Sequence, residues 1–444
     1  MKPKIKSLLL ILIIIFSGFL FKCSTSNGIK VEPVLKNESC TADINNKYVI
    51  YIPSHSTDCK EFSMIVILDP HGSGEFAIRK FIDCAENYKC ILVASNLVRN
   101  NFSGFMQAIE LMISDVKSKY PFGDKIYIAG FSGGARMAIT YAQGNRVNGV
   151  LAFGALANAD QIKSLNTKVF AISGISDFNF TEAAPYLLDI DNIPSNLRLE
   201  ISGEIHQWPE PYDIKRAMGN IILSENFKNN KCIKKNELIK NYSNECKSNV
   251  DSLYQAGLLI PARLACQNVL SLNEILHKGY FRDILNSILH DNRFNEELIQ
   301  LKKSLEFEFK VRDAYYNALR VRDDVWWANE IDDLNKHINE TGEIYKKNAY
   351  RRIKAFLGIV CYSVTNNALR TGDLNTAQKI LKIYKLVEPE NPDMYYFSAL
   401  LDLKTGETDL IKENLEKALR EGFTDFSTLK KDFSADYLSG LKLE

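Results

Sequence analysis

One stretch, KIYIAGFSGGARMAIT at residues 125–140, decides how the first half of this chain folds. It begins with a short apolar run, residues 125–129, whose β-branched and aromatic side chains are typical of a buried strand. Apolar side chains then follow at helical spacing over residues 133–143. Ser132 is therefore predicted to lie at a tight strand-to-helix turn, where the flanking glycines let neighbouring backbone pass without a Cβ clash.

The same alternation of strand and helix extends to both sides of this stretch. Short β-branched runs predict further strands at residues 48–53, 64–69, 91–95, 147–153, 169–173 and 197–202. Helical spacing of apolar residues predicts helices at residues 76–88 and 102–119. Strands that alternate with helices in this way indicate an α/β fold, in which a mostly parallel sheet carries helices on both faces.

The chain changes character near residue 225. A length of 444 residues exceeds one ordinary domain, and beyond this point the apolar pattern is helical throughout, with only three of the 12 prolines. We therefore predict an α/β domain at residues 45–225, a linker rich in Asn and Lys at residues 226–247, and an all-helical domain at residues 248–444.

The overall composition excludes several classes of protein. The chain is 46% hydrophobic and 25% charged, which excludes collagen-like and wholly disordered chains. Lys and Arg number 55 against 54 Asp and Glu, a formal net charge of +1. This balance gives no reason to expect an electrostatic nucleic-acid binder, so no nucleic-acid partner is predicted.

The first 22 residues are predicted to be an export signal rather than part of the fold. Three lysines precede an almost unbroken apolar run at residues 8–21, which is short for a membrane span. Cys23 follows, so the segment resembles a bacterial lipoprotein signal, although Lys22 stands where a small residue is usual. We predict lipid attachment at Cys23, a tether at residues 23–44 and a location at the cell envelope. The alternatives are secretion to the periplasm or the exterior, and an uncleaved signal anchor in the membrane.

Eight cysteines remain besides Cys23. An even number in an exported chain is compatible with disulfides, and the pairs nearest in sequence are Cys40–Cys59, Cys84–Cys90 and Cys232–Cys246. The alternative is that most of these residues are buried free thiols.

The turn at residues 130–134 reads Gly-Phe-Ser-Gly-Gly and matches the pattern Gly-x-Ser-x-Gly. In this setting the serine hydroxyl stands on a strained elbow at the carboxyl end of a strand. The following helix begins with partial positive charge, so the N–H of Gly133 is predicted to stabilise an oxyanion formed at Ser132. The alternative is a glycine-rich turn in which the serine only caps the helix.

Two later loops hold the residue types that activate a serine. One predicted strand ends just before Asp177 and the next ends just before His206. Since active-site residues gather at the carboxyl ends of parallel strands, His206 is predicted to take the proton of Ser132, and Asp177 to orient the imidazole. Asp160 and Glu204 are weaker alternatives for the acid.

Together these motifs resemble the α/β-hydrolase superfamily. They are the His-Gly-Ser-Gly loop at residues 71–74, the serine elbow, Asp177 and the run His206-x-Trp208-Pro209. Over about residues 45–225 the chain looks like the secreted esterases grouped with feruloyl esterases and poly(3-hydroxyalkanoate) depolymerases. The resemblance implies cleavage of a small-molecule or polymer ester through a serine acyl-enzyme.

The resemblance also gives a role to the loop at residues 71–74. It implies that the N–H of Ser73 is the second oxyanion donor, with Gly72 and Gly74 as alternatives. The chain departs from some of these enzymes, because about 180 residues leave no room for a cap domain. Three polar residues on the same edge of the sheet are predicted to cap a loop, or alternatively to touch substrate: Asn96, Arg99 and Asn100.

The helical half contains an internal repeat of 34 residues, clearest at residues 360–425. The residues Leu369, Gly372, Ala377 and Leu381 recur as Leu403, Gly406, Ile411 and Leu415. This segment is similar to tetratricopeptide repeats, a resemblance that implies a protein or peptide partner; the alternative is a buttress for the first half. The aromatic set Tyr315, Tyr316, Trp326 and Trp327 is predicted to be core rather than a ligand groove.

The function predicted from these features is that of an exported serine hydrolase, most simply a carboxylesterase, with a helical domain for partner docking. A serine peptidase of the same fold and a non-catalytic binding lipoprotein are the alternatives. The chain lacks the His-Glu-x-x-His zinc motif and the phosphate-binding motif Gly-x-x-x-x-Gly-Lys-Ser/Thr, so no metal and no cofactor are predicted.

Overall fold

A computed structural model describes residues 30–57, 59, 62–225 and 234–441. The predicted signal at residues 1–22 and the predicted lipid attachment at Cys23 lie outside the described residues, so both stay predictions. No helix in the described part of the chain has the length and apolar character that a membrane crossing requires.

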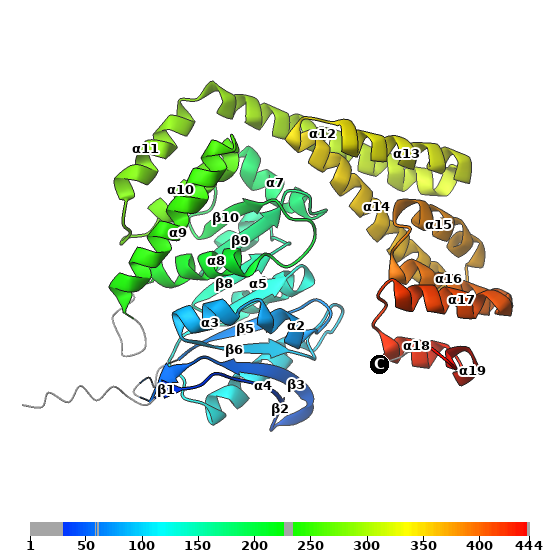
Figure 1. Cartoon of the computed structure of the whole chain (residues 1–444), viewed down its shortest axis with the longest axis horizontal. Coiled ribbons are helices and arrows are strands. Elements are labelled where there is room, and N and C mark those ends of the chain that lie inside the picture. Colours follow the sequence, from blue (N-terminus) through cyan, green and yellow to red (C-terminus); the bar gives the residue numbers. More distant parts are fainter. Residues whose placement is uncertain (1–29, 58, 60–61, 226–233, 442–444) are drawn as a thin grey trace, which may run out of the picture.

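The first half is built on an eight-stranded sheet (Figure 1). In spatial order its strands are β10 (Leu197–Ser202), β9 (Lys168–Gly174), β8 (Gly149–Phe153), β7 (Ile126–Phe131), β5 (Ser63–Leu68), β6 (Cys90–Ser95), β3 (Asp43–Ile52) and β2 (Val34–Cys40). The pairings from β10 through to β6 are parallel, whereas β3 runs antiparallel to both β6 and β2. The predicted mostly parallel sheet is confirmed. A separate two-stranded sheet pairs β1 (Lys30–Val31) with β4 (His55–Ser56).

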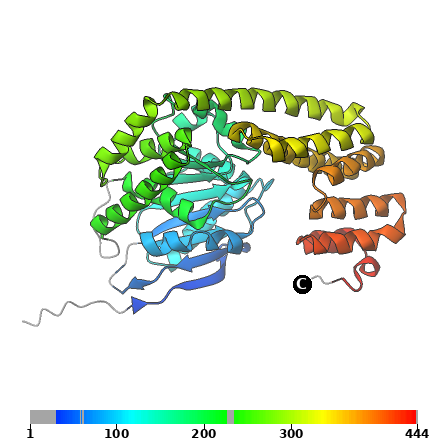
Figure 2. The same ribbon diagram turned by 45° about the horizontal axis from the view of Figure 1, so that its top comes forward.

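Helices cover both faces of this sheet because its strands are apolar on both sides (Figure 2). One face packs against α4 (Phe105–Lys119), α5 (Gly133–Gly144), α6 (Ala159–Lys163) and α7 (Phe180–Leu188). The other packs against α2 (Gly74–Arg79), α3 (Ile82–Tyr88) and α8 (Pro211–Leu223). The predicted helix at residues 76–88 is therefore two helices. The break falls at Phe81, whose fully buried ring packs against Phe153 and Trp208.

The helical half begins with α9 (Lys235–Gln255) and α10 (Leu259–Leu270), which belong to the same cores as the sheet. Helix α10 covers the edge strand β10, and Asn268 Nδ2 donates to the carbonyl oxygen of Leu199 at 3.0 Å. This contact occupies part of a strand edge that would otherwise be open. The two halves are thus joined by packing as well as by the chain.

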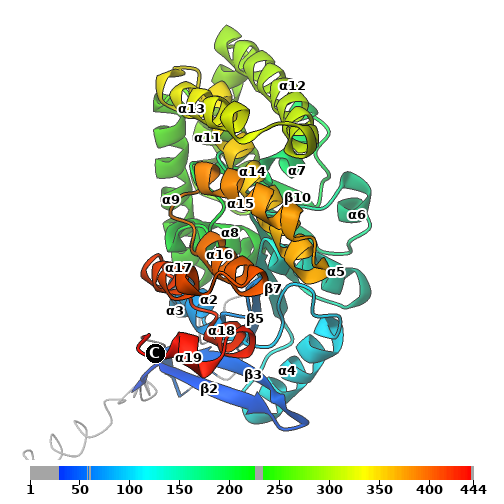
Figure 3. The same ribbon diagram turned by 90° about the vertical axis from the view of Figure 1, so that its right-hand side faces the viewer.

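The remaining helices form an arch that rises from the sheet and descends beside it (Figures 1 and 3). They are α11 (Lys278–Leu289), α12 (Asn292–Val321), α13 (Asp324–Glu340), α14 (Ile344–Thr371), α15 (Leu374–Val387), α16 (Pro392–Thr405), α17 (Thr408–Arg420), α18 (Phe426–Asp432) and α19 (Ala435–Leu438). Most of them share a third apolar core, which contains Tyr315 and Trp327 as predicted, with Trp326 packed against it. The prediction of a core position is wrong for Tyr316, whose side chain lies on the outer face of α12 and is 47% exposed. Gly372 and Gly406, the glycines 34 residues apart, both end a helix with φ near +80°. The tetratricopeptide identity of this repeat stays a prediction.

Two of the expected boundaries need correction. Strand β2 and the start of β3 lie inside the segment expected as a tether at residues 23–44, because β2 pairs along its whole length with β3. Helix α9 begins at Lys235, inside the segment expected as a linker at residues 226–247.

The three predicted disulfide pairs are wrong. Six cysteines are free and buried, and Cys59 is disulfide-bonded. The free cysteines are Cys40, Cys84, Cys90, Cys246, Cys266 and Cys361. Burial raises the pKa of these thiols, that of Cys90 to about 12, so they are packed as apolar side chains.

A buried carboxylate ties the β2–β3 hairpin to α4 and gives a testable pH dependence. Asp115 accepts hydrogen bonds from the Tyr48 hydroxyl at 2.6 Å and from Thr41 at 2.8 and 2.9 Å, and it pairs with Lys119. Burial alone would raise the pKa of Asp115, but these hydrogen bonds outweigh burial and lower the pKa to about 2.

We expect Asp115→Asn to lower the free energy of unfolding by about 2 kcal/mol at pH 7. Because the pKa of the folded state lies below the ordinary value, this contribution is complete above about pH 5 and is lost as the pH falls towards 2. Urea unfolding at pH 7, 5, 4 and 3 should show the difference in unfolding free energy between variant and wild type narrowing below pH 5. The exposed Asp124→Asn serves as the control. A gap that stays constant with pH would contradict this account.

Candidate active site

Ser132 lies at a strained turn between β7 and α5, as predicted. Its backbone has φ 51° and ψ −118°, a conformation that non-glycine residues rarely adopt. The Ser132 N–H donates to the carbonyl oxygen of Phe153 on β8 at 2.8 Å, which fixes the turn to the sheet. The half-buried hydroxyl therefore stands at the carboxyl edge of the sheet.

His206 lies between Ser132 and Asp177, which are 45 residues apart in the sequence. Its Nε2 is 3.0 Å from Ser132 Oγ, and its Nδ1 is 2.8 Å from Asp177 Oδ1. The imidazole packs between two aromatic rings, with centroid distances of 4.7 Å to Phe131 and 4.1 Å to Phe178. The structure thus brings together the three residues predicted from the sequence.

Asp177 is held in the loop that follows β9, and its side chain is 1% exposed. Its Oδ1 also accepts the N–H of Asn179 at 2.7 Å, while Asn179 Nδ2 donates to the carbonyl oxygen of Gly154 at 2.8 Å. The alternative acids lie elsewhere, since Asp160 is exposed on α6 and Glu204 bonds to Gln207. A buried carboxylate held in this way can orient an imidazole and stabilise its protonated form.

Gly133, the predicted oxyanion donor, is the first residue of α5. N–H groups in the first turn of a helix have no acceptor within the helix, so they are available to an anion. The side-chain oxygen of Asn100 lies so close to Gly133 that a Cβ atom there would overlap it. Asn100 N–H in turn donates to the carbonyl oxygen of Pro70 at 2.8 Å, which places the Asn100 loop beside the candidate site.

The structure does not present the N–H of Ser73 as a free donor. It points to Asp69 Oδ1 at 3.2 Å, and the N–H of His71 donates to the same oxygen at 2.9 Å. The N–H of Gly74, one of the alternatives, donates to Asn96 Oδ1 at 3.0 Å. Asn96 therefore caps this loop, as predicted, and Ser73 is placed at the site without being directed into it.

Two residues of the site were not assigned a role from the sequence. Asp69 is 3% exposed, and its Oδ2 accepts the indole N–H of Trp208 at 2.9 Å. This bond joins the loop at residues 71–74 to the loop that carries His206. An Asp directly before Pro-His-Gly is typical of a turn-forming residue, and that signal could have identified its structural role.

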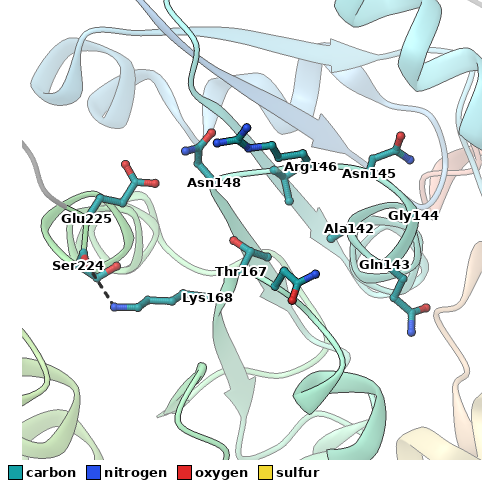
Figure 4. Close-up of a pocket in the computed structure, with 12 residues that line it drawn as sticks. Ala142, Gln143, Gly144, Asn145, Arg146, Asn148, Thr167, Lys168, Ser224 and Glu225 are labelled. Atoms are coloured by element: carbon teal, nitrogen blue, oxygen red, sulfur yellow. Dashed lines mark hydrogen bonds between the residues drawn. The ribbon is translucent and has the colours of Figure 1, made fainter.

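A separate crevice lies on the side of the sheet where the parallel strands begin, opposite the candidate site. It has a volume of about 630 Å³ and is lined by residues that precede β8 and β9, among them Asn148 and Thr167 (Figure 4). On its wall Lys168 Nζ donates to the carbonyl oxygen of Ser224 at 3.3 Å. Because these residues lie at the amino ends of parallel strands, the crevice cannot serve Ser132. Among the described residues, no three His, Cys, Asp or Glu side chains converge as metal ligands would.

Comparison with known proteins finds similarity only among solved structures. No family model and no curated protein matches the chain. S-formylglutathione hydrolase FrmB from Staphylococcus aureus is 15% identical, with 43% of this chain and 94% of that chain covered and a TM-score of 0.35. The corresponding values for Est1E from Butyrivibrio proteoclasticus are 14%, 42%, 98% and 0.33. For the esterase PF2001 from Pyrococcus furiosus they are 13%, 40%, 88% and 0.31.

The fold class follows from the strand order and the helix positions of the chain itself. The first half is a mostly parallel eight-stranded sheet of the α/β-hydrolase type, and an all-helical domain follows it. A fold of this class hosts many activities, so the function has to be argued from the site.

Proposed function

We propose that the chain is a serine hydrolase, most simply a carboxylesterase, in which Ser132, His206 and Asp177 form the catalytic triad. The observation that carries the proposal is the continuous hydrogen-bonded series Asp177–His206–Ser132, with distances of 2.8 and 3.0 Å. A binding scaffold has no need of a serine in a strained backbone conformation joined through a histidine to a buried carboxylate.

In the proposed reaction His206 Nε2 removes the proton from Ser132 Oγ as that oxygen attacks the carbonyl carbon of the substrate. The imidazolium formed in this step is stabilised by the Asp177 carboxylate. Collapse of the tetrahedral intermediate breaks the ester bond, and His206 returns the proton to the departing alcohol. Water then attacks the acyl-enzyme by the same route and releases the acid.

The developing oxyanion needs hydrogen-bond donors at the turn. The N–H of Gly133 is the first of them, supported by the partial positive charge at the start of α5. The N–H of Ser73 is the proposed second donor, and it would exchange its 3.2 Å contact with Asp69 for the oxyanion. Asp69 Oδ1 would keep the hydrogen bond from the N–H of His71 at 2.9 Å after this exchange.

Export and partner binding are further parts of the proposal. The charged and apolar character of residues 1–22 and the position of Cys23 support lipid anchoring at the cell envelope. The 34-residue repeat supports docking of a protein or peptide partner on the helical half.

Labelling of the full chain with a fluorophosphonate probe tests the catalytic proposal. We expect one probe per chain, attached at Ser132, and no labelling of Ser132→Ala. The exposed Ser164→Ala should label like the wild type. A panel of acyl esters and peptide amides then separates an esterase from a peptidase. A folded wild-type chain that takes up no probe would contradict the proposal and favour the scaffold alternative.

A further inference from the structure

The loop that carries Asp177 is held by the helical half of the chain. Arg352 Nη1 on α14 donates to the carbonyl oxygen of Ile175 at 2.5 Å, and the Ser176 hydroxyl donates to Asn348 Oδ1, also on α14, at 2.6 Å. On the other side of Asp177, Arg312 Nη2 on α12 donates to the carbonyl oxygen of Phe178 at 3.0 Å. Three residues around the acid are therefore fixed by side chains 134 to 177 positions away.

The two arginines share a single carboxylate; Arg352 is fully buried, and the Arg312 side chain is 12% exposed. Arg352 and Glu308 are both 0% exposed, and Arg352 Nε donates to Glu308 Oε2 at 2.9 Å. The other oxygen, Glu308 Oε1, pairs with Arg312. The Arg352 guanidinium also lies 4.6 Å from the ring centroid of Phe180, at the end of the same loop. Burial lowers the pKa of Arg312, whereas the carboxylates of Glu308 and Asp177 act to raise it.

A buried charge cluster of this kind is not expected to add much to the free energy of unfolding. Taking charges out of water is expensive, and replacing a buried Arg–Glu–Arg triad with apolar residues is often neutral or stabilising. What this cluster does provide is direction, because guanidinium groups donate hydrogen bonds in a fixed planar geometry. Here those donors end on backbone oxygens on either side of Asp177.

The loop positions determine the geometry at His206 in two ways. Asp177 contributes the oxygen that receives His206 Nδ1, and Phe178 contributes the ring on which the imidazole packs at 4.1 Å. A shift of about 1 Å in groups that position a reaction can cost about 100-fold in rate. The contacts that hold this loop in place are therefore expected to affect the rate of the proposed proton transfer.

We propose that Arg312, Arg352 and Asn348 are positioning residues, and that the helical half acts as a clamp which holds Asp177 against His206. This inference rests on the proposed triad. It makes α12 and α14 part of the catalytic apparatus, rather than only a platform for a partner.

Arg312→Met is the sharpest test. The variant keeps an apolar side chain against Phe356 and leaves the Glu308 charge paired with Arg352 at Oε2. It removes the ion pair at Glu308 Oε1 and the hydrogen bond to the carbonyl oxygen of Phe178. We expect kcat for ester hydrolysis to fall by about 10- to 100-fold with little change in KM. In an Asp177→Asn background the same substitution should change kcat by less than about twofold, since the group it positions no longer acts.

Arg263→Met is the matched control. Like Arg312, Arg263 belongs to the helical half and has little exposed surface. It also contacts the first half, through an ion pair with Asp191, and it also lies over an aromatic ring, that of Phe294. It does not contact the Asp177 loop in the described structure. Its loss should alter the urea unfolding midpoint as much as that of Arg312 while leaving kcat unchanged.

A second readout keeps the clamp testable without turnover. The hydrogen-bonded Nδ1 proton of His206 should give a strongly deshielded signal in the proton NMR spectrum, assigned by its loss in His206→Ala. We expect the signal to weaken in Arg312→Met and to persist in Arg263→Met. If the wild type does not react with the fluorophosphonate, the proposed function is wrong. The NMR comparison of Arg312→Met with Arg263→Met would still test the clamp. If Arg312→Met leaves both the NMR signal and kcat unchanged, the clamp is wrong and the proposed function stands. The clamp is also wrong if the losses in kcat from Arg312→Met and Asp177→Asn multiply in the double variant.

Discussion

Replacing His206 with alanine is expected to lower kcat for ester hydrolysis by about 10⁴- to 10⁶-fold. The reason is the position of its ring, whose two nitrogens contact Ser132 Oγ at 3.0 Å and Asp177 Oδ1 at 2.8 Å. Without the imidazole no group accepts the hydroxyl proton, and a neutral serine is a weak nucleophile. The loss should fall on kcat and not on KM, because the imidazole acts in the transition state.

Non-additivity makes this prediction specific. Ser132→Ala should cost about as much as His206→Ala, and the double variant should be no slower than either single variant by more than about twofold. Initial rates on one activated ester, with the same preparations checked by circular dichroism, give the comparison. The exposed His290→Ala is the control, since it lies at the end of α11 away from the site. Losses that multiply in the double variant would mean that the two residues do not act as a unit.

The proximity of the three residues of the proposed triad could be predicted from the sequence because of a property of parallel sheets. Ser132, Asp177 and His206 each follow a strand, and the carboxyl ends of β7, β9 and β10 meet at one edge whatever the details of packing. The strands themselves were predictable because they are apolar on both faces and bounded by glycine-containing turns. Strand β2 was not, because most of its side chains are exposed and only its pairing with β3 identifies it.

Features that depend on the local direction of the backbone could not be predicted from the sequence. The N–H of Ser73 turns to Asp69, and nothing in the run of residue types gives the direction of a single N–H in a loop. The disulfide predictions failed for a similar reason. Cys84 and Cys90 are close in sequence and both fully buried, yet they remain free, because bridging demands a specific separation and orientation of the Cβ atoms.

The clamp on the Asp177 loop left no pattern that sequence reasoning could detect. Arg352 reaches a carbonyl oxygen 177 positions earlier, and charged residues on a helix usually mean a solvated face. The contacts of α14 with the loop after β9 and with Glu308 on α12 bury this charge. Under the proposed clamp, the proposed activity of the first half depends on the helical half.

The close approach of α5 to the sheet gives the second large expected effect. A Cβ atom at Gly134 would overlap the carbonyl oxygen of Leu68, at the end of β5. Because the obstacle is backbone, no change of side-chain rotamer can relieve it, and α5 has to move away from the sheet. We expect Gly134→Ala to lower the free energy of unfolding by about 3 kcal/mol or more. Alanine gains about 1 kcal/mol in helix propensity over glycine, which the overlap outweighs.

A helical glycine with no neighbouring atoms serves as the control, because an alanine there changes the helix propensity without any steric overlap. Gly279 lies near the start of α11, and no atom lies within 4 Å of the position that an alanine methyl group would take there. Gly279→Ala should therefore be neutral or stabilising by up to about 1 kcal/mol. Urea unfolding of both variants measures the two effects.

The displaced helix carries Gly133 and follows Ser132, so Gly134→Ala should also react more slowly at the serine. We expect labelling with the fluorophosphonate to be at least about tenfold slower, even where the protein is still folded. Wild-type stability in Gly134→Ala would mean that α5 and β5 are not in contact at this glycine. If Gly134→Ala is destabilised but reacts with the fluorophosphonate at the wild-type rate, the geometry at Ser132 does not depend on the packing of α5 against β5.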